Sequence, residues 1–516
     1  MMDVRLKEKM KTWILVLLLA SSIVQFGIHW SRQVQSGPFR FITDLFSNVN
    51  VTNIDEMSVE KKVEYIAPNR MIVSDEESKR WELNYSSDAW HKTWDDFKTY
   101  YFPLLLTTKP DKQRSLSTWN SLITSNRMVL IEFENPVSTA LLPWLTGRTS
   151  DNNTIQAALP YEDIAKIAIV PKENVNETDN TIYVLANSGV FRYTLSIPKG
   201  ALPKSWYVMD QENLRNKNNR LLSLMGETYK LENASPDLLL SNEANNPVSL
   251  PIYEAKKPDA FPVEYLTDNL QALQNSILLN KKDSLLTRLD NETGDVVFSD
   301  TENLYRVDVL GNLTYQYLPE ITDITDNMEN AYAQAISFIE DRRWLVGEAS
   351  IILSNARGIS LNQEDAPYAI QNETNKLSFD SSNRDSQKPD NDGKMKAYQF
   401  SFIYRMDGNS ITGLDMNQNM VAPIIITASE NRVLSCHWSI RQFTLIDAKD
   451  WNQFFVDLDE DISRYLPVLI KKDQQLTMIR NGYLLPIQQK DMFLSPQWFL
   501  TSNTIVYHLP MKVEVE

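Results

Sequence analysis

Residues Trp13 to Trp30 read WILVLLLASSIVQFGIHW, the only long apolar run in the chain. An α-helix rises ~1.5 Å per residue, so a helix over this run would be roughly 27 Å long, close to the ~30 Å hydrocarbon thickness of a bilayer. Both ends carry a tryptophan, and amphipathic aromatic rings are enriched at the level of the lipid headgroups. The run therefore predicts one transmembrane helix over residues 13–30.

The residues that flank this run predict its orientation. Arg5, Lys7, Lys9 and Lys11 precede it, and clustered Lys and Arg stay on the cytoplasmic side of a membrane. Residues 1–12 are thus expected to form a cytoplasmic tail, and the remainder an extracytoplasmic body. The alternative is a cleaved signal peptide, which needs a small-residue cleavage site. Because the run ends in FGIHW instead, the sequence favours an uncleaved anchor and a single-pass protein of the cell membrane.

The bulk composition limits what the body can be. With 516 residues, 42% of them hydrophobic and 10% aromatic, the chain is long enough for two or three packed domains. The net charge of −16 argues against nucleic-acid binding, which depends on clustered Lys and Arg. The single cysteine, Cys436, excludes an internal disulfide framework, so stability outside the cell must come from the size of the core.

Three strand pairs of similar design recur along the body. Each has alternating apolar positions around a turn whose residues tolerate positive φ, which is typical of a tight β-hairpin. Two more strands, Pro423–Ala428 and Arg432–Gln442, and a last pair over residues 494–510 follow in the second half of the chain. The three hairpins are Thr181–Ile197, turning at Asn187-Ser188-Gly189; Leu304–Tyr317, turning at Gly311-Asn312; and Tyr398–Ile411, turning at Asp407-Gly408-Asn409.

Helices and one further strand are predicted around these hairpins. A first helix lies between a Ser87-Asp88 cap and Pro103 as a stop, and a second over Asp326–Trp344 has Asp326 as its cap. Residues 127–133, RMVLIEF, form a buried strand that is followed by Asn135-Pro136. Core packing explains an aromatic stripe on the first helix better than a ligand cage does. The residues of that stripe are Trp90, Trp94, Phe97 and Tyr101.

These elements predict an α+β fold, in which an N-terminal transmembrane helix is followed by a multi-domain region of antiparallel sheets with packed helices. A polar stretch of low complexity, residues 361–396, is expected to be a flexible insertion. The expected domains are an N-terminal α+β domain over 38–200, a central α+β domain over 201–320, and a C-terminal α+β domain over 321–516 that contains the insertion.

Motifs for catalysis and for metal or phosphate binding are missing from the sequence. No H-x-x-x-H pair, G-x-S-x-G elbow or glycine-rich phosphate loop occurs. Cys436 alternates with polar neighbours, so it is predicted to point into the core, where burial makes a thiol inert, while His437 faces out. Asp457, Asp459 and Asp461 alternate as in a calcium loop but lack its glycine and distal glutamate. We therefore expect no enzymatic activity, no cofactor and no metal.

Three polar residues interrupt the apolar run: Ser21, Ser22 and Gln25. Small and hydrogen-bonding side chains in a membrane helix allow close approach of a partner helix, which makes these residues the candidate contact with another membrane protein. The alternative is that serine is well tolerated in a membrane and that Gln25 reaches the headgroups.

Several segments occur in an order that is typical of one protein family. They are the opening LKEKMKTWILVLLLASSIVQFGIHW and, along the body, RMVLIEFENP, NLYRVDVLGNLTYQY, AYAQAISFIEDRRW, AYQFSFIYRMDGNSITG and LSPQWFL. In this order the chain resembles the YycH family of Gram-positive bacteria over nearly its whole length. It departs from the family in its greater length and in the polar stretch 361–396.

The resemblance implies regulation of another protein. YycH-type proteins are single-span membrane proteins that, with the related YycI, associate with the WalK (YycG) sensor histidine kinase of cell-wall homeostasis. It implies contact with the kinase through membrane helices, outside domains that assemble together, and a C-terminal domain over 321–516 that shares the YycI fold. The alternative function is an extracytoplasmic module that binds or senses a cell-envelope polymer through an aromatic groove.

Overall fold

The computed structural model describes the body in segments that all fall within one compact unit, Ile54–Glu516. The described residues are 65–74, 79–125, 127–146, 158–160, 163–170, 179–196, 219–224, 235, 237–241, 250–259, 261, 273, 277–278, 286–289, 293–319, 327–361, 395–417, 419–446, 476–502 and 505–510. Within these ranges no helix is both long and apolar enough to cross a membrane. Several predicted features lie outside them: the tail 1–12, the run Trp13–Trp30 with Ser21, Ser22 and Gln25, the triplet Asp457, Asp459 and Asp461, and residues 362–394 of the predicted insertion.

The first sheet is built from the N-terminal half of the chain. Its strands are β1 (Arg70–Ser74), β2 (Arg80–Glu82), β3 (Lys112–Arg114), β4 (Val129–Ser138), β5 (Asp163–Val170), β6 (Asp179–Ala186), β7 (Gly189–Ser196), β8 (Arg220–Leu224) and β9 (Leu239–Ser241). Among the described residues these nine strands lie in the order β3-β7-β6-β5-β4-β1-β2-β8-β9, and all neighbours are antiparallel. The hairpin predicted over Thr181–Ile197 is confirmed as β6 and β7.

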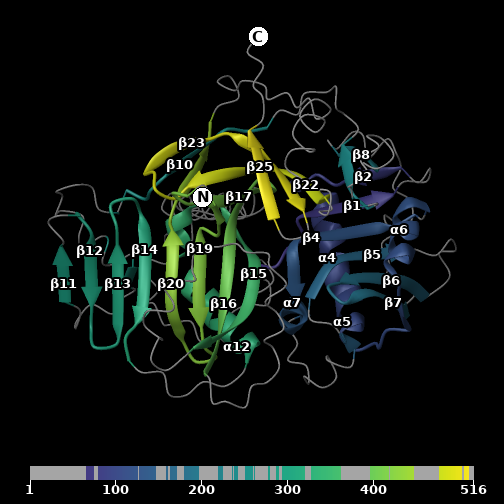
Figure 1. Ribbon diagram of the computed structural model, residues 1–516, viewed down its shortest axis with the longest axis horizontal. Helices are drawn as coiled ribbons and strands as arrows, with labels where there is room; N and C mark the ends of the chain where they lie inside the picture. Colours follow the sequence, from purple (N-terminus) through teal and green to yellow (C-terminus); the bar gives the residue numbers. More distant parts are fainter. Residues whose placement is uncertain are drawn as a thin grey trace, which may run out of the picture. The chain divides into compact units, whose positions relative to one another are not determined.

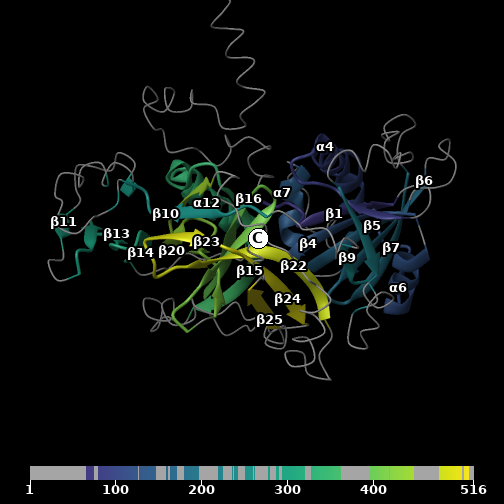
Figure 2. The same cartoon turned by 90° about the horizontal axis from the view of Figure 1, so that it is seen from above.

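Helices cover both faces of the first sheet because its strands are apolar on both faces. Figure 2 shows helices α4 and α6 on opposite sides of it. Met71 and Val73 of β1 belong to the main apolar cluster with α4, whereas Ile72 packs with Trp119 of α6 in a second cluster. The helical elements of this part are α4 (Asp88–Asp96), the π-helix η2 (Phe97–Tyr101), α5 (Phe102–Leu105), α6 (Leu116–Ser125), the 3₁₀-helix η3 (Thr139–Leu141) and α7 (Leu142–Thr146).

The predicted aromatic helix exists, but Pro103 does not stop it. The Ser87 hydroxyl caps α4 by accepting the amide of Trp90 at 3.2 Å, as predicted. The chain then passes through η2, where the amide of Phe102 donates to the carbonyl of Phe97. Pro103 falls in the first turn of α5, directly after this π-helical turn, so it lies where the hydrogen-bond pattern of the helix already changes. All four residues of the aromatic stripe are at most 4% exposed, so the stripe is core and not a ligand cage.

The second half of the chain forms a larger third sheet and a small second sheet (Figure 1). The second sheet consists of β21 (Gln442–Leu445), β10 (Tyr253–Lys256) and β23 (Asp491–Leu494), in this order. The third sheet consists of β11 (Leu286–Leu289), β12 (Val296–Ser299), β13 (Asn303–Val307), β14 (Asn312–Tyr317), β15 (Ser350–Leu361), β16 (Met395–Met406), β17 (Asn409–Leu414), β18 (Met420–Val421), β19 (Ile424–Ala428), β20 (Val433–Ser439), β22 (Leu476–Pro486), β24 (Pro496–Ser502) and β25 (Ile505–Pro510).

The third sheet follows the path β11-β12-β13-β14-β20-β19-β16-β17-β22-β24-β25, with β15 on β16 and β18 on β17. The other predicted hairpins are confirmed as β13 with β14 and β16 with β17, and the predicted last pair as β24 with β25. One pair, β17 with β22, is parallel, which the prediction of antiparallel sheets did not include. The described body is thus a sheet-rich α+β fold, as predicted.

Helix α12 (Met328–Glu340) covers one face of the third sheet, against β16, β19 and β20 (Figures 1 and 2). Its cap is Asn327, which accepts the amide of Asn330 at 3.1 Å, so the predicted cap at Asp326 is wrong by one residue. A short 3₁₀-helix, η6 (Arg343–Val346), follows it.

Strand β20 places Cys436 in the core, as predicted, and burial raises the pKa of its thiol. His437 lies on the other face but does not face out into solvent. It is half-buried, and its neighbours on that face, Ser435 and Ser439, are buried. The error arises because an alternating pattern indicates which residues share a face, not whether that face is covered.

Two loops of the third sheet share one hydrogen-bond design. In each, an aspartate accepts the backbone amides two and four residues ahead with one carboxylate oxygen, and the side-chain amide of an asparagine with the other. The loops are Asp308–Asn312 and Asp415–Asn419. The turn between β16 and β17 is tighter: Asp407 and Gly408 both have positive φ, as a two-residue hairpin loop requires.

The strands of the predicted central domain are divided among three sheets. β8 and β9 pair in the first sheet, β10 lies in the second, and β11 to β14 pair in the third. The division of the body at residues 200 and 320 stays a prediction.

The parallel contact between β17 and β22 depends on Gly482. A Cβ at this position would lie 2.8 Å from the carbonyl oxygen of Ser410 and 2.6 Å from a ring carbon of Phe499. We expect Gly482→Ala to lower the free energy of unfolding by about 1–3 kcal/mol, because the backbone of β17 must move.

Gly358→Ala on β15 is the matched control, since its Cβ would meet nothing closer than Tyr398 at 3.8 Å. It should be neutral or slightly stabilising, within about 1 kcal/mol. Denaturant titration of the full chain in detergent measures both. Equal losses in the two variants would contradict the close approach at Gly482.

Candidate functional site

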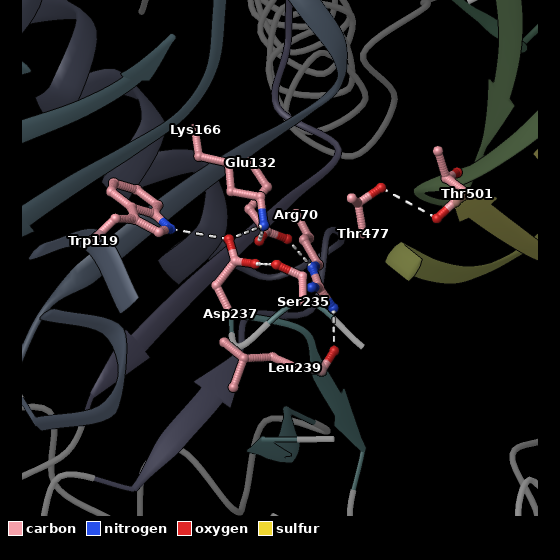
Figure 3. A network of polar contacts seen from close by, with 9 residues as sticks. All are labelled: Arg70, Trp119, Glu132, Lys166, Ser235, Asp237, Leu239, Thr477 and Thr501. Carbon is pink, nitrogen blue, oxygen red and sulfur yellow. Dashed lines mark hydrogen bonds and ion pairs between the residues drawn. The ribbon is translucent and has the colours of Figure 1, made fainter. Parts of the chain in front are cut away.

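Four charged side chains lie together at the first sheet, three of them from its own strands. We call them the charged quartet: Arg70, Glu132, Lys166 and Asp237 (Figure 3). Glu132 is 1% exposed, Asp237 4%, and the two cations 8% each. The Arg70 guanidinium forms an ion pair with Glu132, and the Lys166 ammonium lies 3.1 Å from Glu132 and 2.6 Å from Asp237. Two cations therefore meet two carboxylates in a place without bulk water.

The register of three adjacent strands brings three members of the quartet together. Arg70 of β1 is directly opposite Glu132 of β4, which is directly opposite Lys166 of β5. Opposite residues on antiparallel strands have their Cβ atoms about 4.5–5.5 Å apart, so the row of positive, negative and positive charge forms ion pairs without distortion.

The fourth member comes from the segment that precedes β9. Asp237 accepts hydrogen bonds from the indole of Trp119 at 2.9 Å, from Lys166 at 2.6 Å and from the Ser235 hydroxyl. Arg70 also donates to the carbonyl of Leu239 at 3.0 Å, which holds the same segment from its other side. One oxygen of Asp237 is thus bound by two groups from other parts of the chain, and the other oxygen by Ser235 of its own segment.

The same segment is tied to the third sheet, because the amide of Ser235 donates to the carbonyl of Leu476 in β22 at 2.7 Å. The neighbouring Thr477 hydroxyl donates to the carbonyl of Thr501 in β24 at 3.1 Å (Figure 3). The charged quartet is therefore linked through a few residues to the strands of the other large sheet.

The members of the quartet stay ionised around neutral pH. Burial alone would raise the pKa of Asp237, but Lys166 and the hydrogen bonds that Asp237 accepts outweigh it and hold this pKa at about 2. Burial also opposes ionisation of Glu132, yet Arg70 and Lys166 keep its pKa below the usual range. Burial opposes the charge on Lys166, but Asp237 and Glu132 raise its pKa. Groups with such values do not exchange protons near pH 7, so the quartet suits positioning of the backbone rather than acid–base chemistry.

A second group of polar residues lies where β4 meets the third sheet, and we call it the sheet junction: Glu134, Ser410, Arg405 and Arg480. Glu134 forms an ion pair with Arg480 of β22 and accepts the hydroxyl of Ser410 in β17 at 2.6 Å. Arg405 of β16, directly opposite Ser410, donates to the carbonyl of Pro68 at 3.0 Å. The junction thus joins three strands of the third sheet to the first sheet.

An irregularity in β4 makes the junction possible. Six residues of β4, Glu132 to Val137, lie opposite only three residues of β5, Ile164 to Lys166, so β4 bulges between these pairs. Pro136 lies in this bulge, where its missing N–H leaves no ladder bond unmade. The bulge turns Glu134 and Asn135 toward the third sheet, and Asn135 donates to Ser354 of β15 at 2.9 Å. The strand predicted at 127–133 is confirmed, but it runs on through Asn135-Pro136 to Ser138.

The segment that leads into β1 touches the third sheet as well. The Tyr65 hydroxyl donates to Glu340 at the end of α12, and the amide of Leu353 donates to the carbonyl of Tyr65 at 2.7 Å. Four residues on, the amide of Asn69 donates to the carbonyl of Glu132 at 2.7 Å. The residues just before the first strand are therefore fixed to both large sheets.

Sequence reasoning named none of the residues of the quartet or the junction as a site. A signal was present, because single charged residues interrupt three otherwise apolar strands: RMIV, VLIEF and IAKIAIV. A lone Arg, Glu or Lys in such a run is either buried with a partner or destabilising. Among the described residues no group of three or more His, Cys, Asp or Glu side chains is placed to hold a metal. The predicted contact residues Ser21, Ser22 and Gln25 lie outside the described residues.

The charged quartet predicts a large effect of a single neutralisation. Glu132→Gln leaves two buried cations with one carboxylate, and removal of one partner from a buried ion pair costs about 3–5 kcal/mol. We expect a loss of that size in the free energy of unfolding, measured by denaturant titration. Asp95→Asn is the control, since Asp95 pairs with Lys98 on the surface and is 65% exposed. A loss below about 1 kcal/mol for Glu132→Gln would contradict the quartet.

The low pKa of Asp237 predicts a sensitivity to acid. Because the folded pKa is about 2 and the unfolded value is about 3.9, the stabilisation is complete above pH ~4 and is lost as the pH falls toward ~2. The difference in unfolding free energy between the native chain and Asp237→Asn should therefore shrink by about 2–3 kcal/mol between pH 5 and pH 2. A difference that stays constant over this range would show that Asp237 titrates as an ordinary carboxyl group.

No protein-family model matches the chain, and no curated protein matches it in sequence. Among solved structures, the crystal structure of YycH from Bacillus subtilis is similar to it with a TM-score of 0.45 and 12% identity, over 86% of this chain and 96% of that chain. The crystal structure of an uncharacterized protein from Eubacterium rectale has a TM-score of 0.27 and 13% identity, over 51% of this chain and 82% of that chain. The first of these structures bears the name of the family that the sequence resembles.

Proposed function

We propose that the chain is a membrane-anchored regulatory protein that modulates a sensor histidine kinase of the WalK (YycG) type in cell-wall homeostasis. In this proposal residues 1–12 lie in the cytoplasm, Trp13–Trp30 crosses the membrane once, and the body lies outside. A YycI-like single-span protein is the second partner, and its body assembles with this one. The protein acts by binding and is not an enzyme.

The observation that carries this proposal is the apolar run Trp13–Trp30 with its basic flank, followed by a body in which the segments typical of the YycH family occur in order. A body attached to one membrane helix reaches the cytoplasm only through that helix. It can therefore bias a kinase only by changing how the helix sits against the helices of its partner.

The contacts within the body support such a role. The charged quartet, the sheet junction and the segment Tyr65–Asn69 fasten the first sheet to the third by ion pairs and backbone hydrogen bonds. A partner that binds either sheet would thus act on both. A coupling free energy of ~1–3 kcal/mol between the partner site and the membrane helix is enough to change kinase output roughly 5- to 150-fold.

The test replaces the polar residues of the apolar run in the full chain. We expect Ser21→Leu, Ser22→Leu and Gln25→Leu together to weaken co-purification with the kinase and to bring a kinase-dependent reporter toward its level without this protein. The physical reason is that leucine removes both the close approach and the hydrogen bond at the helix contact. The control is Leu17→Ile with Leu18→Ile, which keeps the length and apolar character of the run.

Wild-type reporter output and wild-type co-purification for the triple variant would refute a helix contact through these residues. Binding of the full chain in detergent to purified cell-wall polymer, with no effect of its deletion on the kinase reporter, would favour a module that binds the cell envelope.

A further inference from the structure

The sheet junction buries more hydrogen-bond donors than it satisfies. Arg405 is 1% exposed, and its Nη1 donates to the carbonyl of Pro68 at 3.0 Å. Its Nε and Nη2 atoms are also buried, and neither has a hydrogen-bond partner among the described residues. Its guanidinium lies 5.6 Å from the ring centre of Tyr85, a contact that attracts a cation but accepts no directed hydrogen bond.

Arg480 also has buried donor atoms without a hydrogen-bond partner among the described residues. Its Nη2 forms the ion pair with Glu134, and its guanidinium lies 4.8 Å from the ring centre of Phe499. Its Nε and Nη1 atoms are buried without a partner among the described residues. Glu134 also accepts the Ser410 hydroxyl with its other oxygen, and among the described residues it forms no ion pair or hydrogen bond with Arg405.

The charges of the junction do not balance. Two guanidinium groups and one carboxylate leave one positive charge in excess, whereas the charged quartet is neutral. Burial lowers the pKa of Arg480, Glu134 raises it in part, and the charge of Arg405 lowers it, so the two guanidinium groups repel each other. Arginine stays protonated in proteins, and a buried charge needs a counter-charge or strong hydrogen bonds.

We propose that the sheet junction binds one small monovalent anion, such as chloride, with the free donors of Arg405 and Arg480. One negative charge would neutralise the excess and accept hydrogen bonds from the four nitrogen atoms that have no partner among the described residues. Water could accept some of these donors, but it supplies no charge. The inference concerns the body itself and goes beyond the proposed regulation of a kinase.

The test measures thermal unfolding of the full chain in detergent while chloride replaces gluconate at constant ionic strength. We expect the unfolding midpoint to rise with chloride and to saturate, because a ligand that binds only the folded state stabilises it in this way. Arg480→Met removes the excess charge and should abolish the saturable response. Glu134→Gln increases the excess charge and should lower the half-saturating chloride concentration about tenfold or more.

Arg432→Gln is the matched control, because Arg432 is exposed and should leave the response to chloride unchanged. The absence of a saturable response in the native chain, or an equal response in Arg480→Met, would overturn the proposal and assign the donors to water. If Arg480→Met does not fold, anomalous diffraction from crystals of the native chain soaked in bromide tests the site instead. An anomalous peak within hydrogen-bond distance of Arg405 and Arg480 supports the site, and its absence refutes it.

Discussion

Strand β4 is the element on which the body depends, because it places two glutamates in two different environments. Glu132 lies between Arg70 and Lys166 in the first sheet, and Glu134 reaches Ser410 and Arg480 of the third. In a regular strand, residues two positions apart face the same side, and the second glutamate would be buried without a cation. The bulge between Glu132 and Val137 removes this conflict, so a local irregularity of the backbone decides how two sheets are joined.

Much of the fold follows from the sequence because its signals are local. The hairpins turn at residues with positive φ, and α12 has an apolar face with the period of a helix, so both are visible within about 15 residues. The buried charges are not local: Arg70 and Glu132 are 62 positions apart, Lys166 and Asp237 71, and Glu134 and Ser410 276. Isolated charges in apolar strands indicate that partners must exist, but only the pairing of strands identifies them. The prediction that Pro103 ends the first helix was wrong because a π-helical turn before it lets the chain stay helical. The sequence carries no signal for that turn.

The quartet and the junction both lie largely away from solvent but differ in charge, and this difference separates their roles. Two cations and two carboxylates neutralise each other in the quartet, so it needs nothing from outside the chain. In the junction Arg405 and Arg480 share one carboxylate, Glu134, and four of their nitrogen atoms are buried without a partner among the described residues. The unequal charge is therefore the property that distinguishes the junction from the quartet as a candidate binding site.

Buried ion pairs add little net stability compared with apolar residues of the same size, so their value for this body lies in the single arrangement that they permit. A slip of β4 by one residue would turn Glu132 to the opposite face of the sheet, among the apolar side chains packed against α4, and would separate it from both Arg70 and Lys166. The cost of that misplaced charge excludes the slipped register. The regulator proposed above would need this property, because a body with several packings would pass an average of them to a membrane helix. The same charges that hold the strands in register thus restrict the body to one arrangement of its strands.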